Sequence, residues 1–353
     1  MNTILQGSVL TELKKIPDNT INMVITSPPY WGLRNYNTNP QIWDGLENCE
    51  HEWETAEPRR QRSNDDIKDK ESKQATQNAS AFNSSGGEFC TKCGAWEGEL
   101  GSEPTFNLYI KHLCDIFDEV KRVLTKDGTC WVNLGDTYSA NRPYQVTGTK
   151  QVDGSQPKVK QPQAKENGLK EKCLCQIPNR FSIEMTNREW ILRNEIIWHK
   201  PNAMPSSVKD RFTVDYEKLF LFSKNKKYYF EQQKEPVKDS YDGKRGSSKT
   251  RTKLQSAMCG DKKDTVVKYT ERNKRSMWSI NTQPLKDAHF AVFPEELVET
   301  PIKAGCPENG IVMDIFIGSG TTARVAKKLN RNYIGIELNP EYINIAKNRI
   351  SNI

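Results

Sequence analysis

The sequence lacks any apolar run approaching the roughly 18 residues that a membrane-spanning helix needs. Its first residues, 1–7, also lack the charged and then apolar pattern of a secretion signal. The nine cysteines, an odd number, are therefore expected to be reduced thiols or metal ligands rather than paired disulfides. These absences argue against a membrane protein and a disulfide-built secreted protein, and they predict a cytoplasmic one.

Apolar side chains are also scarce. Without glycine they make up 35% of the 353 residues, and counting the 21 glycines leaves the share below the roughly 45–50% of compact domains. The length predicts two domains, or one large α/β domain carrying insertions. Polar composition places the insertions at residues 54–88, 139–172 and 234–275.

The third of these segments differs from the others in charge. The whole chain has a net charge of +7, and 234–275 alone holds 13 basic and 6 acidic residues, an equal surplus. Such a segment favours a polyanionic partner, and a solvated basic loop is the alternative. The side chains that are candidates for contacting such a partner are Lys244, Arg245, Lys249, Arg251 and Lys253.

Apolar periodicity predicts alternating strands and helices. The first helix should stop at Asp127-Gly128. Such alternation indicates an α/β fold with a mostly parallel sheet covered on both faces. The expected strands are 21–26, 129–134, 195–199, 218–222, 311–316 and 333–337, and the expected helices are 109–124, 321–329 and 341–350.

The sequence Ser27-Pro28-Pro29-Tyr30 follows the first of these strands. Ligands of α/β sheets bind at the carboxyl ends of the strands. Two prolines remove two backbone donors and leave rigid carbonyl acceptors, the Ser27 hydroxyl adds an acceptor, and the Tyr30 ring offers a stacking face. These acceptors and the aromatic ring could together orient an amino group that is attached to a flat ring. A Pro-Pro pair by itself more often forms a turn.

A glycine-rich segment lies between a strand and a helix near the C-terminal end, and Glu337 ends the next strand about 20 residues on. Glycines allow a ligand to approach closely, a helix N-terminus offers N–H groups to an anion, and the acid can bind two ribose hydroxyls. With no Walker-type lysine, the pattern suits an adenosine cofactor bearing a carboxylate better than a triphosphate. The candidate cofactor residues here are Asp314, Phe316, Gly318, Ser319, Gly320, Thr321, Thr322 and Glu337.

Cys49 and His51 precede the first polar insertion, and Cys90 and Cys93 follow it. Three thiols and one imidazole form a complete tetrahedral set for structural zinc, which would tie the two ends of the insertion together. Unpaired thiols beside a surface histidine are the alternative. The rival pair, Cys173-x-Cys175, has no histidine nearby.

Taken in order, these motifs resemble the beta class of amino DNA methyltransferases over nearly the whole chain. In that family the catalytic motif, here 26–30, comes first, and the cofactor motif, here 314–322 with Glu337, comes last. Residues 289–294 are similar to the segment that closes over the methionine moiety, which adds Phe293 and Pro294 to the cofactor residues. Segments 197–202 and 210–212 also resemble family blocks. Gly7-Ser8 departs from the Gly-Asp of relatives, whose Asp contacts the adenine of the cofactor.

The resemblance implies a Rossmann-like S-adenosylmethionine methyltransferase sheet in circularly permuted motif order, acting on double-stranded DNA. Residues 27–30 would orient the exocyclic amino group of a flipped-out base. Serine before Pro-Pro is similar to the cytosine-N4 subgroup, and an adenine-N6 enzyme is the alternative. The resemblance also implies that the cysteine cluster is a structural zinc clip, and a restriction-modification setting would pair the enzyme with an endonuclease without a stable complex.

More distant alternatives are a protein glutamine methyltransferase, whose cofactor motif comes first, and a DNA-binding protein without catalysis. Asp136 is expected either to line the pocket or to cap a turn, and His199 to be positional. Trp43, Trp53 and Trp96 are expected in the core or around the zinc. The expected organisation is a catalytic half (1–48), a zinc-clipped insertion (49–100), a continuation of the sheet (101–230), a target-recognition region (231–276) and a cofactor-binding half (277–353).

Overall fold

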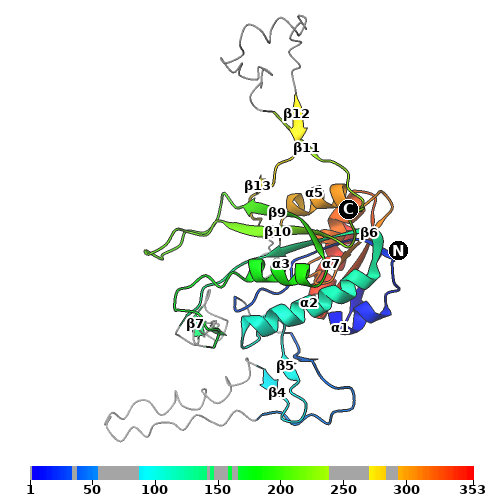
Figure 1. Ribbon diagram of the computed structural model, residues 1–353. Coiled ribbons are helices and arrows are strands. Elements are labelled where there is room, and N and C mark those ends of the chain that lie inside the picture. The colour runs from blue at the N-terminus through cyan, green and yellow to red at the C-terminus, as the bar shows by residue number, and fades with distance from the viewer. Residues whose placement is uncertain are drawn as a thin grey trace, which may run out of the picture.

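The computed structural model describes residues 2–33, 38–54, 87–140, 144–146, 158–160, 166–237, 270–283 and 293–353. Their central element is an eight-stranded sheet with the strand order β1-β15-β14-β2-β6-β10-β9-β13 (Figure 1). These strands are β1 (Asn2–Gln6), β2 (Ile21–Thr26), β6 (Leu124–Leu134), β9 (Ile191–His199), β10 (Tyr216–Ser223), β13 (Met277–Ser279), β14 (Ile311–Asp314) and β15 (Asn332–Glu337).

Five of the seven pairs of neighbouring strands are parallel, and β10 is antiparallel to both β6 and β9. The predicted mostly parallel sheet is therefore confirmed. Strand β1 was not predicted, because three of its five residues are Asn, Thr and Gln. It pairs with β15, so the first strand of the sheet and the last lie side by side at one edge.

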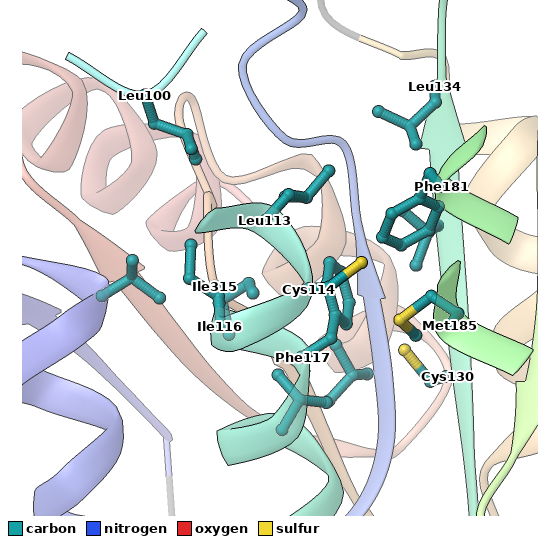
Figure 2. Packing of buried hydrophobic residues seen from close by; sticks show 14 of the residues in the cluster. Leu100, Leu113, Cys114, Ile116, Phe117, Cys130, Leu134, Phe181, Met185 and Ile315 are labelled. Carbon is teal, nitrogen blue, oxygen red and sulfur yellow. The ribbon is translucent and has the colours of Figure 1, made fainter. Parts of the chain in front are cut away.

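Helices cover both faces of this sheet. On one face lie α1 (Val9–Glu12), η1 (Leu13–Lys15), α2 (Phe106–Val123) and α3 (Ile177–Asn187); on the other lie α5 (Glu295–Gly305), α6 (Thr321–Lys328) and α7 (Pro340–Ser351). Figure 2 shows the core under α2, where the sulfur-bearing side chains of Cys114, Cys130 and Met185 point toward one another. In the described part of the chain no cysteine is in a disulfide, and no helix is long and apolar enough to cross a bilayer.

Among the predicted boundaries that differ from the structure, two have a clear local cause. Helix α2 ends at Val123, one residue before the predicted end, but the predicted stop at Asp127-Gly128 was wrong, because these residues lie inside β6, which starts at Leu124. The register between β2 and β6 jumps there, since Ile21 faces Leu124 whereas Met23 faces Thr129. A Cβ on Gly128 would come within 3.0 Å of Leu124 Cδ2 and 3.1 Å of Asn22 O, so this irregular stretch of β6 has little room for a larger residue.

The second wrong boundary is the end of β14. The strand stops at Asp314 and not at Phe316 as expected. The carboxylate of Asp314 accepts a hydrogen bond from the backbone N–H of Phe316 at 3.1 Å, and this bond turns the chain into the glycine-rich loop.

A small sheet flanks the first polar insertion and lies below α2 in Figure 1. Its strands are β3 (Gln41–Trp43), β5 (Trp96–Gly98) and β4 (Glu88–Phe89). The two ends of the insertion meet, because Glu54 N donates to Phe89 O at 2.9 Å. Buried His112 of α2 stacks on Trp43 and Trp96, with ring centroids 4.8 and 5.6 Å apart, and so joins the small sheet to the main domain.

The ends of the basic segment also meet. Strand β11 (Lys234–Pro236) pairs antiparallel with β12 (Glu271–Asn273), and the pair projects from the main sheet in Figure 1. In the second polar segment, β7 (Tyr144–Val146) pairs with β8 (Lys158–Lys160). The candidate DNA-binding residues Lys244, Arg245, Lys249, Arg251 and Lys253 lie outside the described residues, as do positions 289–292.

Candidate active site

The two motifs singled out from the sequence line one cavity of about 260 Å3 at the carboxyl ends of β2, β14 and β15. The Ser-Pro-Pro-Tyr loop contributes all four of its residues, Ser27, Pro28, Pro29 and Tyr30. Of the residues predicted to bind cofactor, those that line the same cavity are Phe293, Phe316, Gly318, Ser319, Thr321 and Glu337. Segments separated by nearly the whole chain therefore share one site.

Asp314 lies behind the cavity wall and connects its two sides. One carboxylate oxygen accepts from the Thr26 hydroxyl at 2.6 Å and the other from the Thr322 hydroxyl at 2.6 Å. All three residues are buried, and burial raises the pKa of Asp314 to about 6. This carboxyl joins the end of the strand before the catalytic loop to the start of α6, and it does not line the cavity.

The glycine-rich loop is held against the acid predicted to bind ribose. Glu337 accepts from Gly318 N at 2.8 Å and from Asn339 N at 2.9 Å, and burial raises its pKa. Since an ionised carboxylate has about four acceptor sites, this acid retains capacity for ligand hydroxyls. Gly320 has a φ of +83°, and a Cβ there would lie 2.7 Å from that of Ala346, so glycine is required at this turn. Pro294 caps α5 and does not line the cavity.

The Tyr30 hydroxyl is fixed by contacts from two strands. It lies 2.9 Å from Asn133 Oδ1 on β6 and 2.8 Å from Glu217 Oε2 on β10, and the other oxygen of Glu217 pairs with Lys200. The Ser27 hydroxyl is 3.3 Å from the Tyr30 hydroxyl. A side chain at Gly135 would place its Cβ 2.6 Å from the Tyr30 ring, so glycine there leaves room for the ring.

Several lining residues were not singled out as site residues from the sequence, among them Asn133, Trp198, Lys200, Glu217 and Thr282. The first four lie at or directly beside strand ends on the cavity side of β6, β9 and β10. The sequence signal that could have identified these residues was their position at a strand end. For Glu217 this signal could be used only once β10 was known to run antiparallel to its neighbours.

Three lesser expectations are resolved by the contacts. Asp136 accepts from Thr137 N at 2.8 Å and Ile177 N at 3.1 Å, so it caps a turn and does not line the cavity. His199 is positional, with Nδ1 3.1 Å from the Ser279 hydroxyl. The three tryptophans pack as expected, Trp53 stacking on His51, and Trp43 also lines the cavity.

Cys49, His51, Cys90 and Cys93 come together, with one potential ligand atom from each within 4.8 Å of the others. The Sγ atoms of Cys49 and Cys90 are 3.9 Å apart, and Cys93 Sγ is 3.4 Å from His51 Nδ1. A tetrahedral zinc with bonds of about 2.3 Å to sulfur and about 2.0 Å to nitrogen separates its ligand atoms by roughly 3.5 to 3.8 Å. The residues present therefore fit the metal, and neither Cys173 nor Cys175 belongs to this cluster.

The sheet is Rossmann-like, and one cavity at its strand ends is lined by a glycine-rich loop, an acid and a Ser-Pro-Pro-Tyr loop. This combination is the one expected of an S-adenosylmethionine-dependent amino-methyltransferase. Comparison with known proteins makes the assignment more specific. Residues 21–348 match the N6/N4 methyltransferase family of DNA methylases, and the chain belongs to this family of DNA amino-methyltransferases.

Relatives match along nearly the whole chain. Type II methyltransferase M.Cfr9I of Citrobacter freundii is 34% identical over 349 residues, covering 99% of this chain and 87% of the relative. Type II methyltransferase M.SmaI of Serratia marcescens is 33% identical over 350 residues, covering 98% and 90%.

Two solved structures support the fold. The cytosine-N4-specific PvuII DNA methyltransferase superimposes with a TM-score of 0.54 at 17% identity, covering 99% of this chain and 86% of that one. A DNA modification methylase of Thermus thermophilus, described as putative and complexed with S-adenosylmethionine, gives a TM-score of 0.50 at 17% identity, covering 100% and 94%.

The buried carboxyl of Asp314 predicts a pH-dependent stability. Its pKa is raised in the folded state, so the folded protein retains a proton that the unfolded chain has lost, and this contribution to stability disappears as the pH rises through about 6. Between pH 4 and 7, wild type should lose about 2 kcal/mol of unfolding free energy relative to Asp314→Asn, which cannot titrate. Urea unfolding of both proteins across this range measures the difference. A constant difference would show that the carboxyl is ionised throughout.

Proposed function

We propose that this DNA methyltransferase transfers the methyl group to the exocyclic N4 of cytosine. The observation that carries the proposal is Ser27 before Pro28-Pro29 on the wall of the cavity that the glycine-rich loop also lines. The cytosine-N4 specificity of the PvuII DNA methyltransferase, a structural neighbour, agrees with this choice. Adenine N6 is the competing target.

In the proposed mechanism a target base turns out of the duplex and enters the cavity beside Tyr30. The Ser27 hydroxyl and the Pro28 carbonyl orient its amino group, and the Tyr30 ring stacks on the base. Asn133 and Glu217 hold the Tyr30 hydroxyl, and thereby fix the ring. Bound S-adenosylmethionine supplies the electrophilic methyl group, so these residues act by orientation and no covalent enzyme intermediate is needed.

On the cofactor side, we propose that Glu337 binds the ribose hydroxyls and that the loop 316–321 holds the rest of the cofactor. Phe293 closes the wall near the methionine moiety. Asp314 and Thr322 act from behind the wall by fixing the loop, and Gly320 lets the loop pack on α7. At Ser8 the family resemblance would lead one to expect an Asp. Here the Ser8 hydroxyl caps α1 by accepting a hydrogen bond from Leu10 N at 3.2 Å.

The product tests this proposal. DNA incubated with wild type and labelled S-adenosylmethionine, then digested to nucleosides, should contain N4-methylcytosine. Ser27→Ala should reduce the single-turnover rate by about 100-fold, because it removes an orienting group at the reacting nitrogen. Labelled N6-methyladenine would instead establish the alternative target.

Cofactor binding is the control for Ser27→Ala, since the serine follows β2 whereas Glu337 ends β15, and β14 lies between these strands. Its affinity for S-adenosylmethionine, measured by calorimetry without DNA, should equal that of wild type. A variant that turns over at the wild-type rate would remove Ser27 from the mechanism.

We also propose that Cys49, His51, Cys90 and Cys93 hold a structural zinc. The cluster lies in the module that carries Gln41 and Trp43, two lining residues of the cavity. The same module is continuous with Gly101, whose carbonyl accepts from Gly32 N just after the catalytic loop, at 2.9 Å. Zinc would therefore brace one wall of the site, and no reaction step involves it.

Elemental analysis tests the zinc. Purified wild type should contain about one zinc per chain, and Cys90→Ser should contain much less, because three ligands remain of the four that structural zinc takes. Cys173→Ser changes a thiol outside the cluster and should keep the metal. Less than half a zinc in wild type, unaltered by Cys90→Ser, would leave the four residues as unpaired thiols and a histidine.

Region 231–276 is proposed to recognise the DNA target, and its stem is the β11–β12 pair. A separate endonuclease of a restriction-modification system is the proposed functional partner, in keeping with the type II relatives. Each basic side chain that meets a phosphate releases counterions, which makes binding steeply salt-dependent.

Neutralising Lys244, Arg245, Lys249 and Arg251 together should therefore flatten the plot of log affinity against log salt for nonspecific DNA by about 3 to 4 units. Fluorescence anisotropy at several salt concentrations measures the slope. A charge-matched control replaces cations away from this region, namely Lys14, Lys126, Lys226 and Lys347. Equal slopes in wild type and the first variant would make 234–275 a solvated loop.

A further inference from the structure

The connection between β9 and β10 carries a concentration of exposed apolar side chains. Phe212 is 97% exposed and Met204 is 87% exposed. Single exposed apolar residues are ordinary, but a group of them marks an interaction surface. Of the eleven exposed large apolar residues in the described part of the chain, four lie in this one connection, and the first residue of β10, Tyr216, is a fifth: Met204, Val208, Phe212, Val214 and Tyr216.

This connection starts and ends at the cavity. Lys200 at its start and Glu217, the second residue of β10, both line the cavity and form an ion pair with each other. Asn202 exchanges two hydrogen bonds with the backbone of Thr282, another lining residue, each at 2.9 Å. Figure 1 shows the connection projecting away from the sheet at the left. The connection that carries the exposed apolar side chains is therefore attached at both ends to the cavity that a base must enter.

The chain next to Phe212 is anchored. Asp210 pairs with Lys172 at 2.7 Å, and the guanidinium of Arg211 lies 3.3 Å from the centroid of the Tyr138 ring. Two successive residues are thus held by the neighbouring segment, while the Phe212 side chain directly after them is open to solvent. An anchored backbone that presents an aromatic ring loses little conformational entropy when the ring binds a partner.

We propose that Phe212, assisted by Met204, is a wedge that enters the base stack of duplex DNA when the target base turns into the cavity. Proteins that distort a duplex insert apolar side chains of this kind between base steps. Extrusion of a base breaks its stacking at a free-energy cost, and an apolar ring in the vacated place restores part of that stacking. The inference rests on the proposed function, in which the base leaves the duplex.

Two duplexes containing the enzyme's own target site test the wedge. One is fully paired, and the other has an abasic position opposite the target base, which makes extrusion easier. On the paired duplex, Phe212→Ala should slow single-turnover methyl transfer by about tenfold or more, because lost stacking raises the cost of extrusion. On the abasic duplex the same variant should be within about twofold of wild type.

A direct readout of extrusion is 2-aminopurine placed at the target position, whose fluorescence increases when it leaves the stack. Phe212→Ala should show a smaller increase than wild type at saturating protein. Phe212→Leu keeps an apolar side chain and should recover most of the rate. Ile183→Ala, which removes a 61% exposed apolar residue from α3, is the matched control and should behave as wild type on both duplexes.

An unchanged rate for Phe212→Ala would overturn the wedge, and so would an equal loss on both duplexes, which would indicate a general defect in binding or folding. These results are distinguishable from failure of the proposed function. In that case wild type itself would give no methylated cytosine on either duplex.

Discussion

The active site depends on one buried carboxyl. Asp314 accepts hydrogen bonds from Thr26, which directly precedes the Ser-Pro-Pro-Tyr loop, and from Thr322, in the first turn of α6. These two threonines are almost 300 residues apart in the chain but are held on one side chain. Because a buried carboxyl without partners is costly, both hydroxyls must be present, and the spacing between the two loops follows from this requirement. The cavity is the space left between loops that are fixed in this way.

A second constraint comes from α2. The Cys-His module would be an appendage without His112, whose buried imidazole stacks on Trp43 and Trp96 and lies 3.1 Å from the Glu103 carboxylate. This contact brings β3 to the cavity wall. The chain therefore uses the module around a mostly polar insertion as a structural wall of its site, and the same module holds the cluster of Cys49, His51, Cys90 and Cys93.

Much of this arrangement could be predicted from sequence because it depends on short-range patterns. Alternation of strands and helices gave the parallel sheet, and the spacing of Cys49, His51, Cys90 and Cys93 gave a cluster that the fold brings together. Features that depend on long-range pairing were missed. Strand β1 is too polar to be recognised before its partner β15 is known, and the end of β14 is decided by a side-chain bond from Asp314. Glu217, near the start of β10, reaches the site only because β10 runs antiparallel to its neighbours.

Strand β1 pairs with β15, and the Ser-Pro-Pro-Tyr loop shares a cavity with the glycine-rich loop near the other end of the chain. This arrangement has a consequence for synthesis. Thr26 leaves the ribosome 288 residues before Asp314, an interval of roughly 15 to 60 seconds at about 5 to 20 residues per second. During that time the nascent chain holds the Ser-Pro-Pro-Tyr loop but lacks the glycine-rich loop that lines the same cavity. The complete cavity can therefore form only after β14 and β15 have been synthesised, and a chain interrupted before β14 lacks one wall of it.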